Sequence, residues 1–374
     1  SLFDNNSSFG PGGAIFNQAT MVMRRSSIRN NTGGDGGGIA NISDHFSVID
    51  SCDVLSNHGS ITGGILAQQT NQGLVINGTT ISGNFATGAA AGGAGISVRP
   101  ASFQAPVDII NCTVSDNFNR IGAAGNAGGI FADPAAIVHI SNSILARDFL
   151  FDRFQQIPQD CVGAPQSFGH NAIDFLPGCS IVLSTDFVGD PRLGTLADAK
   201  PADGIPEGNG AIPLLAGSPM IDWADPGQCQ ATDQLGFPRA DGDLNGSATC
   251  DVGALEFEPI VSSVIALVRT QTVHDPKPPT RDFPAGKDTI TRQYKNKSSE
   301  QIVRPVFVVT TLTDQEMLLN CDPPAPGGVG ARLTPDVGTD LTWGPNEIIT
   351  VTFVIGLKTE ANYRFSVDVV GYPQ

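Results

Sequence analysis

The sequence predicts an all-β protein, and three observations favour that fold class. A short pattern recurs six times in the first half, and its equivalent Asn or Asp residues are spaced by 25, 26, 27, 33 and 31 residues. The 44 glycines and 26 prolines favour many turns and short strands. No lysine precedes Lys200 and no glutamate precedes Glu207, and both residue types favour helices over strands. We therefore expect a right-handed parallel β-helix, then an irregular disulfide-bonded segment, then a C-terminal β-sandwich.

The repeated pattern places residues of one kind at each of several positions. One position is always large and apolar: Phe3, Ile28, Val54, Ile81, Val114 and Leu145. Two residues earlier the side chain is always small: Ser1, Ser26, Cys52, Thr79, Cys112 and Ser143. Three residues after the apolar position stands an Asn or, in the last copy, an Asp: Asn6, Asn31, Asn57, Asn84, Asn117 and Asp148. A Gly-rich turn then leads to an isoleucine: Ile15, Ile39, Ile65, Ile96 and Ile130.

This pattern fits the coils of a parallel solenoid. Short strands cannot bury their inner side chains alone, so coils stack about 4.8 Å apart and like residues form ladders. Asn tolerates the left-handed backbone of a tight bend, and its amide can bond to neighbouring coils. We therefore expect the five Asn residues of the repeat to form one ladder. A β-sandwich with coincidental alternation is the alternative, which six copies in register disfavour.

Changes in pattern divide the chain into three segments. The regular repeat predicts a β-helix over residues 1–185. The repeat loosens in residues 186–258, which we expect to form an irregular segment that closes the β-helix. Residues 259–374 contain strands in which apolar and polar residues alternate, separated by turn clusters. This last segment predicts a β-sandwich of the immunoglobulin or fibronectin type.

Two sets of motifs carry a family resemblance. The Gly-Gly-x-Ile turn and the Ser/Thr-x-Ile/Val-x-x-Asn strand resemble bacterial surface β-helix proteins related to polymorphic outer-membrane proteins and the pectate-lyase-like superfamily. Four later motifs resemble the choice-of-anchor segment that ends such secreted proteins: Gly189–Gly194, Gly217–Asp222, Asp233–Arg239 and Cys250–Glu256. The resemblance implies a β-helix fold and an extracellular or cell-surface location. It implies no particular activity, because this scaffold hosts many functions.

The seven cysteines indicate an oxidising compartment. We expect disulfides between Cys161 and Cys179 and between Cys229 and Cys250, because each pair flanks a short loop. The other three are expected to be buried thiols, with an intermolecular link as the alternative for the last of them: Cys52, Cys112 and Cys321.

One loop contains part of a calcium-binding motif. Asp241, Asp243 and Asn245 have the oxygen spacing of a calcium loop. The twelfth position holds Val252 instead of glutamate, with Asp251 beside it. Calcium bound by these three residues and Asp251 is one hypothesis, and a polar Asx-turn loop is the other. No other cofactor is expected.

The composition and charge exclude several function classes. A net charge of −16 repels nucleic acid and anionic lipid, so neither is an expected partner. The sequence contains no apolar stretch of about 18 residues, so it predicts no membrane span. A β-helix lyase needs a basic residue beside calcium-binding aspartates. Lysine is absent from the solenoid. We expect the clustered arginines of one coil to form ion pairs with aspartates of the next coil: Arg24, Arg25 and Arg29 with Asp50 and Asp53. A glycosidase needs two opposed carboxylates, and no such pair is evident in the sequence. We therefore expect no catalytic role.

The expected function is structural. Ser1 opens inside a strand copy with no capping helix before it, so we expect the first coil to expose an unpaired edge. Head-to-tail contact of this edge with the sandwich of a second copy would build a fibre or sheath, with Leu2 and Phe3 at the joint. The alternative is a surface-displayed protein that binds or degrades polysaccharide. Only three tyrosines and two tryptophans are available to stack on sugars.

Overall fold

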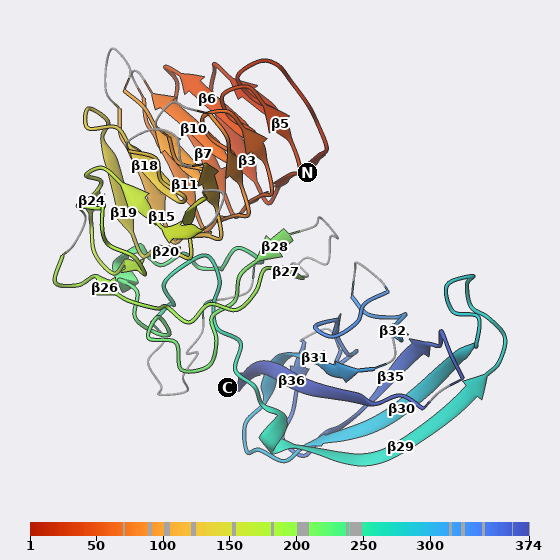
Figure 1. Cartoon of the computed structure of the whole chain (residues 1–374). Coiled ribbons are helices and arrows are strands. Elements are labelled where there is room, and N and C mark those ends of the chain that lie inside the picture. Colours follow the sequence, from red (N-terminus) through yellow and green to blue (C-terminus); the bar gives the residue numbers. More distant parts are fainter. Residues whose placement is uncertain are drawn as a thin grey trace. The chain divides into compact units, whose positions relative to one another are not determined.

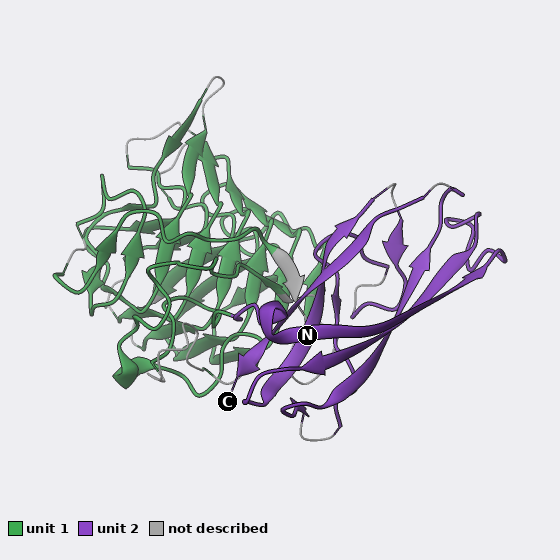
Figure 2. Ribbon diagram, turned by 90° about the horizontal axis from the view of Figure 1, so that it is seen from below, with its two compact units in different colours: residues 1–241, 245–257 green, residues 242–244, 258–374 purple. Residues whose placement is uncertain are grey.

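The computed structural model describes residues 1–69, 72–88, 92–100, 105–120, 125–151, 155–180, 183–199, 209–236, 239, 249–313, 316–322, 326–338, 341–360 and 362–373. These residues form two compact units, one up to residue 257 and the other from residue 258 onward (Figure 2). The helices in the described ranges are two short 3-10 turns, η1 (Pro226–Gln228) and η2 (Ser262–Val264). No helix in this part of the chain has the length and apolar character needed to cross a membrane.

Unit 1 contains a right-handed parallel β-solenoid built from four sheets (Figure 1). Sheet 1 contains β1 (Leu2–Asp4), β4 (Ser27–Arg29), β8 (Asp53–Leu55), β12 (Thr80–Ser82), β16 (Thr113–Ser115), β20 (Ile144–Ala146), β25 (Ala172–Ile173) and β26 (Phe187–Val188). Sheet 2 contains β2 (Ile15–Asn17), β6 (Ile39–Ser43), β10 (Ile65–Gln69), β14 (Ile96–Val98), β18 (Ile130–Ala132) and β23 (Cys161–Val162).

The other two sheets complete each coil. Sheet 3 contains β3 (Met21–Arg24), β7 (Ser47–Asp50), β11 (Leu74–Asn77), β15 (Val107–Ile110), β19 (Val138–Ser141) and β24 (Gln166–Ser167). Sheet 4 contains β5 (Thr32–Gly33), β9 (His58–Gly59), β13 (Phe85–Ala86), β17 (Phe118–Arg120), β21 (Phe149–Phe151) and the antiparallel β22 (Gln156–Pro158). The chain passes through sheets 2, 3, 1 and 4 in turn, so each parallel strand pairs with its equivalent one coil away (Figure 1).

The register confirms the predicted columns. The apolar column of the repeat forms one continuous row in sheet 1: Phe3, Ile28, Val54, Ile81, Val114 and Leu145. The isoleucines that follow the Gly-rich turn form another row in sheet 2: Ile15, Ile39, Ile65, Ile96 and Ile130. Both rows face the interior and belong to, or pack against, one buried core. Because strand side chains alternate between faces, a shift of one residue would turn these rows outward.

The tight bend before sheet 4 differs from the expectation in one detail. The left-handed backbone belongs to the residue before each ladder position, with φ between 52° and 66°: Asn5, Asn30, Ser56, Gly83, Asp116 and Arg147. The ladder residue itself has ordinary backbone and turns its side chain inward. Its amide is therefore free to bond between coils.

The Gly-Gly step has a packing explanation. An ideal Cβ built on Gly64 would lie 2.4 Å from the carbonyl oxygen of Gly95 and 3.3 Å from the side-chain amide of Asn84. A Cβ would also lie close to a ladder side chain at three equivalent glycines: at Gly38 to Asn57, at Gly95 to Asn117 and at Gly129 to Asp148. Glycine thus lets the backbone of sheet 2 approach the ladder closely.

The closing segment covers the outer face of sheet 1. The regular coils extend to Val188, three residues beyond the predicted boundary at 185. The chain then forms the antiparallel pair β27 (Ala197–Ala199) and β28 (Asn209–Ala211) and returns along the solenoid. Thr80 Oγ1 donates to Gln234 Oε1 at 2.5 Å, and the Ala254 amide donates to Thr113 Oγ1 at 3.1 Å.

Unit 2 consists of two antiparallel sheets. One contains β29 (Ile265–Asp275), β30 (Lys287–Asn296), β35 (Ile348–Gly356) and β32 (Met317–Leu318). The other contains β33 (Arg332–Leu333), β31 (Ile302–Leu312), β34 (Thr342–Trp343) and β36 (Phe365–Pro373), which pairs with β31. Side chains of both sheets share one apolar core with Phe307, Trp343 and Phe353 fully buried, so the unit is a β-sandwich.

Candidate functional site

The predicted Asn ladder is an internal hydrogen-bond chain. In each coil the Asn Nδ2 donates to the Oδ1 of the next ladder residue at 2.9–3.0 Å. It also donates to a backbone carbonyl one coil back, as Asn57 does to Ile28 and Asn84 does to Val54. Asn31, Asn57, Asn84 and Asn117 are fully buried. These four residues are therefore structural and present no group to a ligand.

Two carboxyl groups continue this ladder. The Asn117 amide groups donate to Asp148 Oδ1, and the Asp148 backbone amide donates to Asp160 Oδ1 at 3.0 Å. Asp148 Oδ2 is buried with no hydrogen-bond partner in the described residues. Burial, together with the neighbouring Asp160, raises the pKa of Asp148 well above its ordinary value. Burial likewise raises the pKa of Asp160 to about 7.

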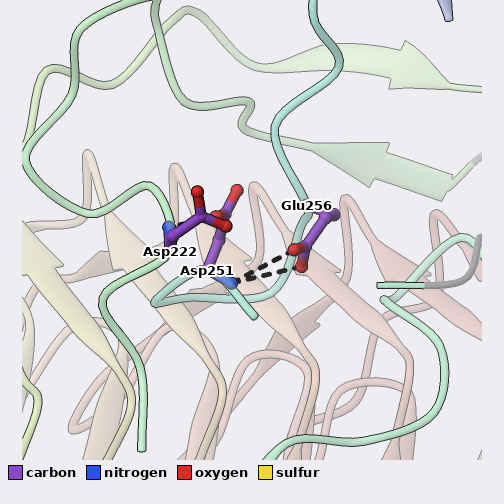
Figure 3. Close-up of side chains that lie close together, drawn as sticks. All are labelled: Asp222, Asp251 and Glu256. Carbon is purple, nitrogen blue, oxygen red and sulfur yellow. Dashed lines mark hydrogen bonds between the residues drawn. The ribbon is translucent and has the colours of Figure 1, made fainter. Parts of the chain in front are cut away.

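Three carboxylates of the closing segment lie together: Asp222, Asp251 and Glu256 (Figure 3). Asp251 and Glu256 are buried, and the Asp251 backbone amide donates to both Glu256 oxygens at 3.3 Å. The Asp251 carboxylate accepts from the backbone amides of Asp222 at 2.7 Å and Phe257 at 2.5 Å. These hydrogen bonds thus join separate parts of the closing segment to one another.

An arginine completes this cluster and bears on the calcium hypothesis. Arg239 donates to Glu256 Oε2 at 2.9 Å in an ion pair whose side chains are 4% and 0% exposed. Burial and the charge of Asp251 raise the pKa of Glu256 to about 9. Of the predicted calcium ligands, Asp241, Asp243 and Asn245 lie outside the described residues. Asp251 accepts from two backbone amides, and the calcium hypothesis stays a prediction.

Both predicted disulfides are present. Cys161 pairs with Cys179, and Cys229 pairs with Cys250. The remaining cysteines are buried and form no disulfide in the described residues: Cys52, Cys112 and Cys321. Burial raises the pKa of Cys52 and of Cys112 to about 12, so neither thiol is a reactive nucleophile at neutral pH.

The expected cross-coil ion pairs form only in part. Arg24 lies 3.4 Å from Asp50, as predicted, but Arg29 lies 4.0 Å from Asp4 in the preceding coil. Asp53 is buried and accepts from the Ser27 hydroxyl at 2.5 Å.

The two predicted assembly residues face opposite ways. Leu2 pairs with Ser27 and is 49% exposed. Phe3 pairs with Ile28 and packs against the solenoid core. Leu2 is thus the more exposed of the two, and Phe3 is partly buried.

A row of aromatic side chains on sheet 4 was missed by the sequence reasoning. His58, Phe85, Phe118 and Phe149 are in register in successive coils and remain partly exposed. The rings of Phe118 and Phe149 lie 5.9 Å apart, and those of His58 and Phe85 lie 5.3 Å apart. Each follows a ladder residue directly, so the signal was present in the repeat.

A cavity in unit 2 was also missed. It has a volume of about 540 Å³ and lies between β29, β30 and the loops that precede β30 and follow β35. Asp288 accepts hydrogen bonds inside it from His274 Nδ1 at 2.8 Å and from the Tyr363 hydroxyl at 2.9 Å. Burial and the hydrogen bond to Asp288 raise the pKa of Tyr363, so its hydroxyl stays protonated. These three residues come from three strands or loops, and no short motif marks them.

Comparison with known proteins identifies the solenoid. Residues 2–147 match the family described as right handed beta helix region. A search among curated proteins found no match. Among solved structures, the chain is similar to the enzymatically active domain of tailspike protein 4 from bacteriophage CBA120, with 12% identity and a TM-score of 0.17. That alignment covers 99% of this chain and 53% of the tailspike chain, so the chain spans about half its length.

Proposed function

We propose that this protein is a non-enzymatic structural protein of the cell surface or extracellular space. The observation that carries the proposal is the burial of the outer face of sheet 1. In the middle of this longest sheet, the outward side chains of Asp53, Thr80 and Thr113 are at most 1% exposed. A face filled by the protein's own closing segment offers no groove to a polymer substrate.

The disulfides support the extracellular part of the proposal. Structural disulfides persist in oxidising compartments, and here one of them holds the segment that covers sheet 1. The resemblance of this segment to choice-of-anchor proteins is consistent with a surface location. We propose it as a surface-directed element on that basis.

We also propose that unit 2 is an immunoglobulin-like module. The order β29-β30-β35-β32 corresponds to the strand order A-B-E-D of such folds, and the pairing of β31 with β36 corresponds to C with F. A module of this kind on a solenoid would serve as a spacer or a docking piece. The basis for this function is the analogy between folds.

Assays of polysaccharide turnover test the non-enzymatic proposal. The purified chain is incubated with pectin, alginate and neutral polysaccharides, with and without calcium, and new chain ends are measured. We expect no turnover. Activity that is present in the parent and lost in Asp50→Asn or Asp108→Asn would contradict the proposal, because these two solenoid carboxylates are only partly buried.

Self-association remains part of the proposed structural role. The exposure of Leu2 makes it the residue to test, because Phe3→Asp would place a charge in the core. We expect Leu2→Asp to weaken association measured by analytical ultracentrifugation and electron microscopy. A parent chain that stays monomeric at high concentration would contradict self-association.

Binding of a surface polysaccharide is a second candidate function, and the aromatic row on sheet 4 favours it. Rows of partly exposed rings at coil spacing offer a repeating apolar surface to a repeating polymer. Phe118→Ala should weaken retention of the chain on an immobilised polysaccharide that the parent binds. Val22→Ala, an exposed position on sheet 3, is the control. Equal retention of all three proteins would remove this candidate.

A further inference from the structure

The cavity of unit 2 has walls that are held in place by the fold. Leu357 and the hairpin before β30 are joined by the bonds from Ala285 N to Leu357 O and from Leu357 N to Gly286 O. Lys358, which follows Leu357, is held by Glu316, a side chain 2% exposed that accepts from its backbone amide at 2.6 Å. A cavity that is ordered before a ligand arrives avoids much of the entropic cost of binding.

The polar groups of the cavity are connected by hydrogen bonds. His274 and Asp288 are directly opposite each other on β29 and β30, and Tyr363 reaches the same carboxylate from the loop before β36. The Asp288 side chain is 15% exposed, whereas that of His274 is 53% exposed. Because a carboxylate accepts from Nδ1, the proton of the neutral imidazole lies on Nδ1 and Nε2 is left as an acceptor.

The chemistry of the lining selects the class of ligand. No Lys or Arg is among the described lining residues, and Asp288 and Glu360 are acidic, which disfavours phosphate and carboxylate ligands. Hydroxyl groups both donate and accept, so they match the carboxylate, the imidazole nitrogen and the amide of Asn362. Leu357 and the Tyr363 ring add apolar surface. The volume lies in the range of small-molecule sites, about 300–1,000 Å³.

We propose that this cavity binds a neutral saccharide. Asp288 and His274 accept hydrogen bonds from its hydroxyl groups, and Tyr363 contacts its apolar face. The site consists of residues of unit 2 alone and requires no catalytic step. It is therefore independent of the non-enzymatic role proposed for the whole chain and of the aromatic row on sheet 4.

A glycan array followed by calorimetry tests the proposal. The full chain is applied to an array of neutral and acidic oligosaccharides, and the dissociation constant of the strongest neutral glycan is then measured. We expect Asp288→Ala to weaken binding at least tenfold and Tyr363→Phe to weaken it severalfold, because the latter keeps the ring and removes one hydrogen bond. His274→Ala, at a more exposed position, replaces Asp288→Ala if that variant does not fold.

Asp108→Asn is the matched control, because Asp108 forms an equivalent 2.8 Å contact with His139 in unit 1. This variant should bind as the parent does. Three results would overturn the proposal: no neutral glycan bound at millimolar concentration, a preference for acidic glycans, or unchanged affinity in the cavity variants. A loss of affinity in Asp108→Asn or Phe118→Ala alone would place the site on the solenoid instead.

Discussion

Asn117 donates two hydrogen bonds to one oxygen of Asp148, from its backbone amide at 2.8 Å and from Nδ2 at 2.9 Å. Asp148 thus takes the place that Asn occupies in the earlier coils. Where those coils have an Nδ2 that donates hydrogen bonds, Asp148 has Oδ2, buried and without a partner in the described residues. A protonated carboxyl group can donate from that position, and an ionised one cannot.

We expect Asp148→Asn to stabilise unit 1 and to flatten its pH dependence. The pKa of Asp148 is raised by burial, and that of Asp160 is raised to about 7. Above the ordinary value of 3.8, the folded chain keeps a proton that the unfolded chain has lost, so stability falls as pH rises toward neutrality. The variant should gain roughly 1–3 kcal/mol at pH 8, the cost of a buried unsatisfied group. Urea unfolding at pH 5, 7 and 8 measures it.

Asn84→Asp is the reciprocal control. It places a carboxyl group inside the ladder, where Asn84 Nδ2 donates to the carbonyl of Val54 and to Asn117. This variant should be less stable than the parent at pH 8 and recover toward pH 5. Parallel pH profiles for the parent and Asp148→Asn would show that Asp148 does not titrate in this range.

The solenoid could be predicted from the sequence because its contacts recur with the repeat. Inward columns such as Ile28 and Ile81 have the same neighbours in every coil, so a pattern reveals them. The bond between Thr80 and Gln234 joins residues 154 positions apart and occurs once, so no pattern reveals it. The cavity of unit 2 was hidden for the same reason, because Tyr363 and Asp288 are 75 positions apart.

The Gly-Gly step should tolerate no side chain at Gly64. A Cβ there would meet the carbonyl oxygen of Gly95 at 2.4 Å, which forces sheet 2 and the ladder apart. We expect Gly64→Ala to destabilise unit 1 by about 1–3 kcal/mol, as overpacking does. Gly10→Ala is the control, because its Cβ would meet only the Ser8 hydroxyl at 3.2 Å. Equal unfolding midpoints in urea for both variants would contradict this explanation of the glycine.

The Cys229–Cys250 disulfide should stabilise the closing segment. It links residues 21 positions apart, and a loop of that size corresponds to about 3 kcal/mol in the chain-entropy account. We expect the double variant Cys229→Ser and Cys250→Ser to lower the thermal midpoint of unit 1. Cys321→Ser, in unit 2, should leave that midpoint unchanged. Recovery of alkylated Cys229 from the unreduced parent by peptide mapping would refute the disulfide itself.

The buried pair of Arg239 and Glu256 gives the last prediction. Arg239 also donates to the carbonyl oxygens of Asp251 and Gly253, both at 3.1 Å. Arg239→Met removes these donors and leaves Glu256 and the two carbonyl oxygens buried without them. Leaving buried acceptors without a donor costs about 1–3 kcal/mol. Glu256→Gln keeps an acceptor for the guanidinium group and should cost less than Arg239→Met at pH 7.

The two variants should also differ in their response to pH. Burial and Asp251 raise the pKa of Glu256 from 4.5 to about 9, so between these values the folded chain holds a proton that the unfolded chain has released. Stability conferred by this group is complete below pH 4.5 and falls as pH rises toward 9. Glu256→Gln removes this dependence, whereas Arg239→Met extends it to higher pH, because loss of the neighbouring cation raises the pKa of the carboxyl group further. Hydrogen exchange of the peptide that contains residues 249–257, followed from pH 5 to pH 9, measures both effects. Identical exchange profiles for the parent and Glu256→Gln would mean that the carboxyl group is ionised throughout and that Arg239 alone sets its charge.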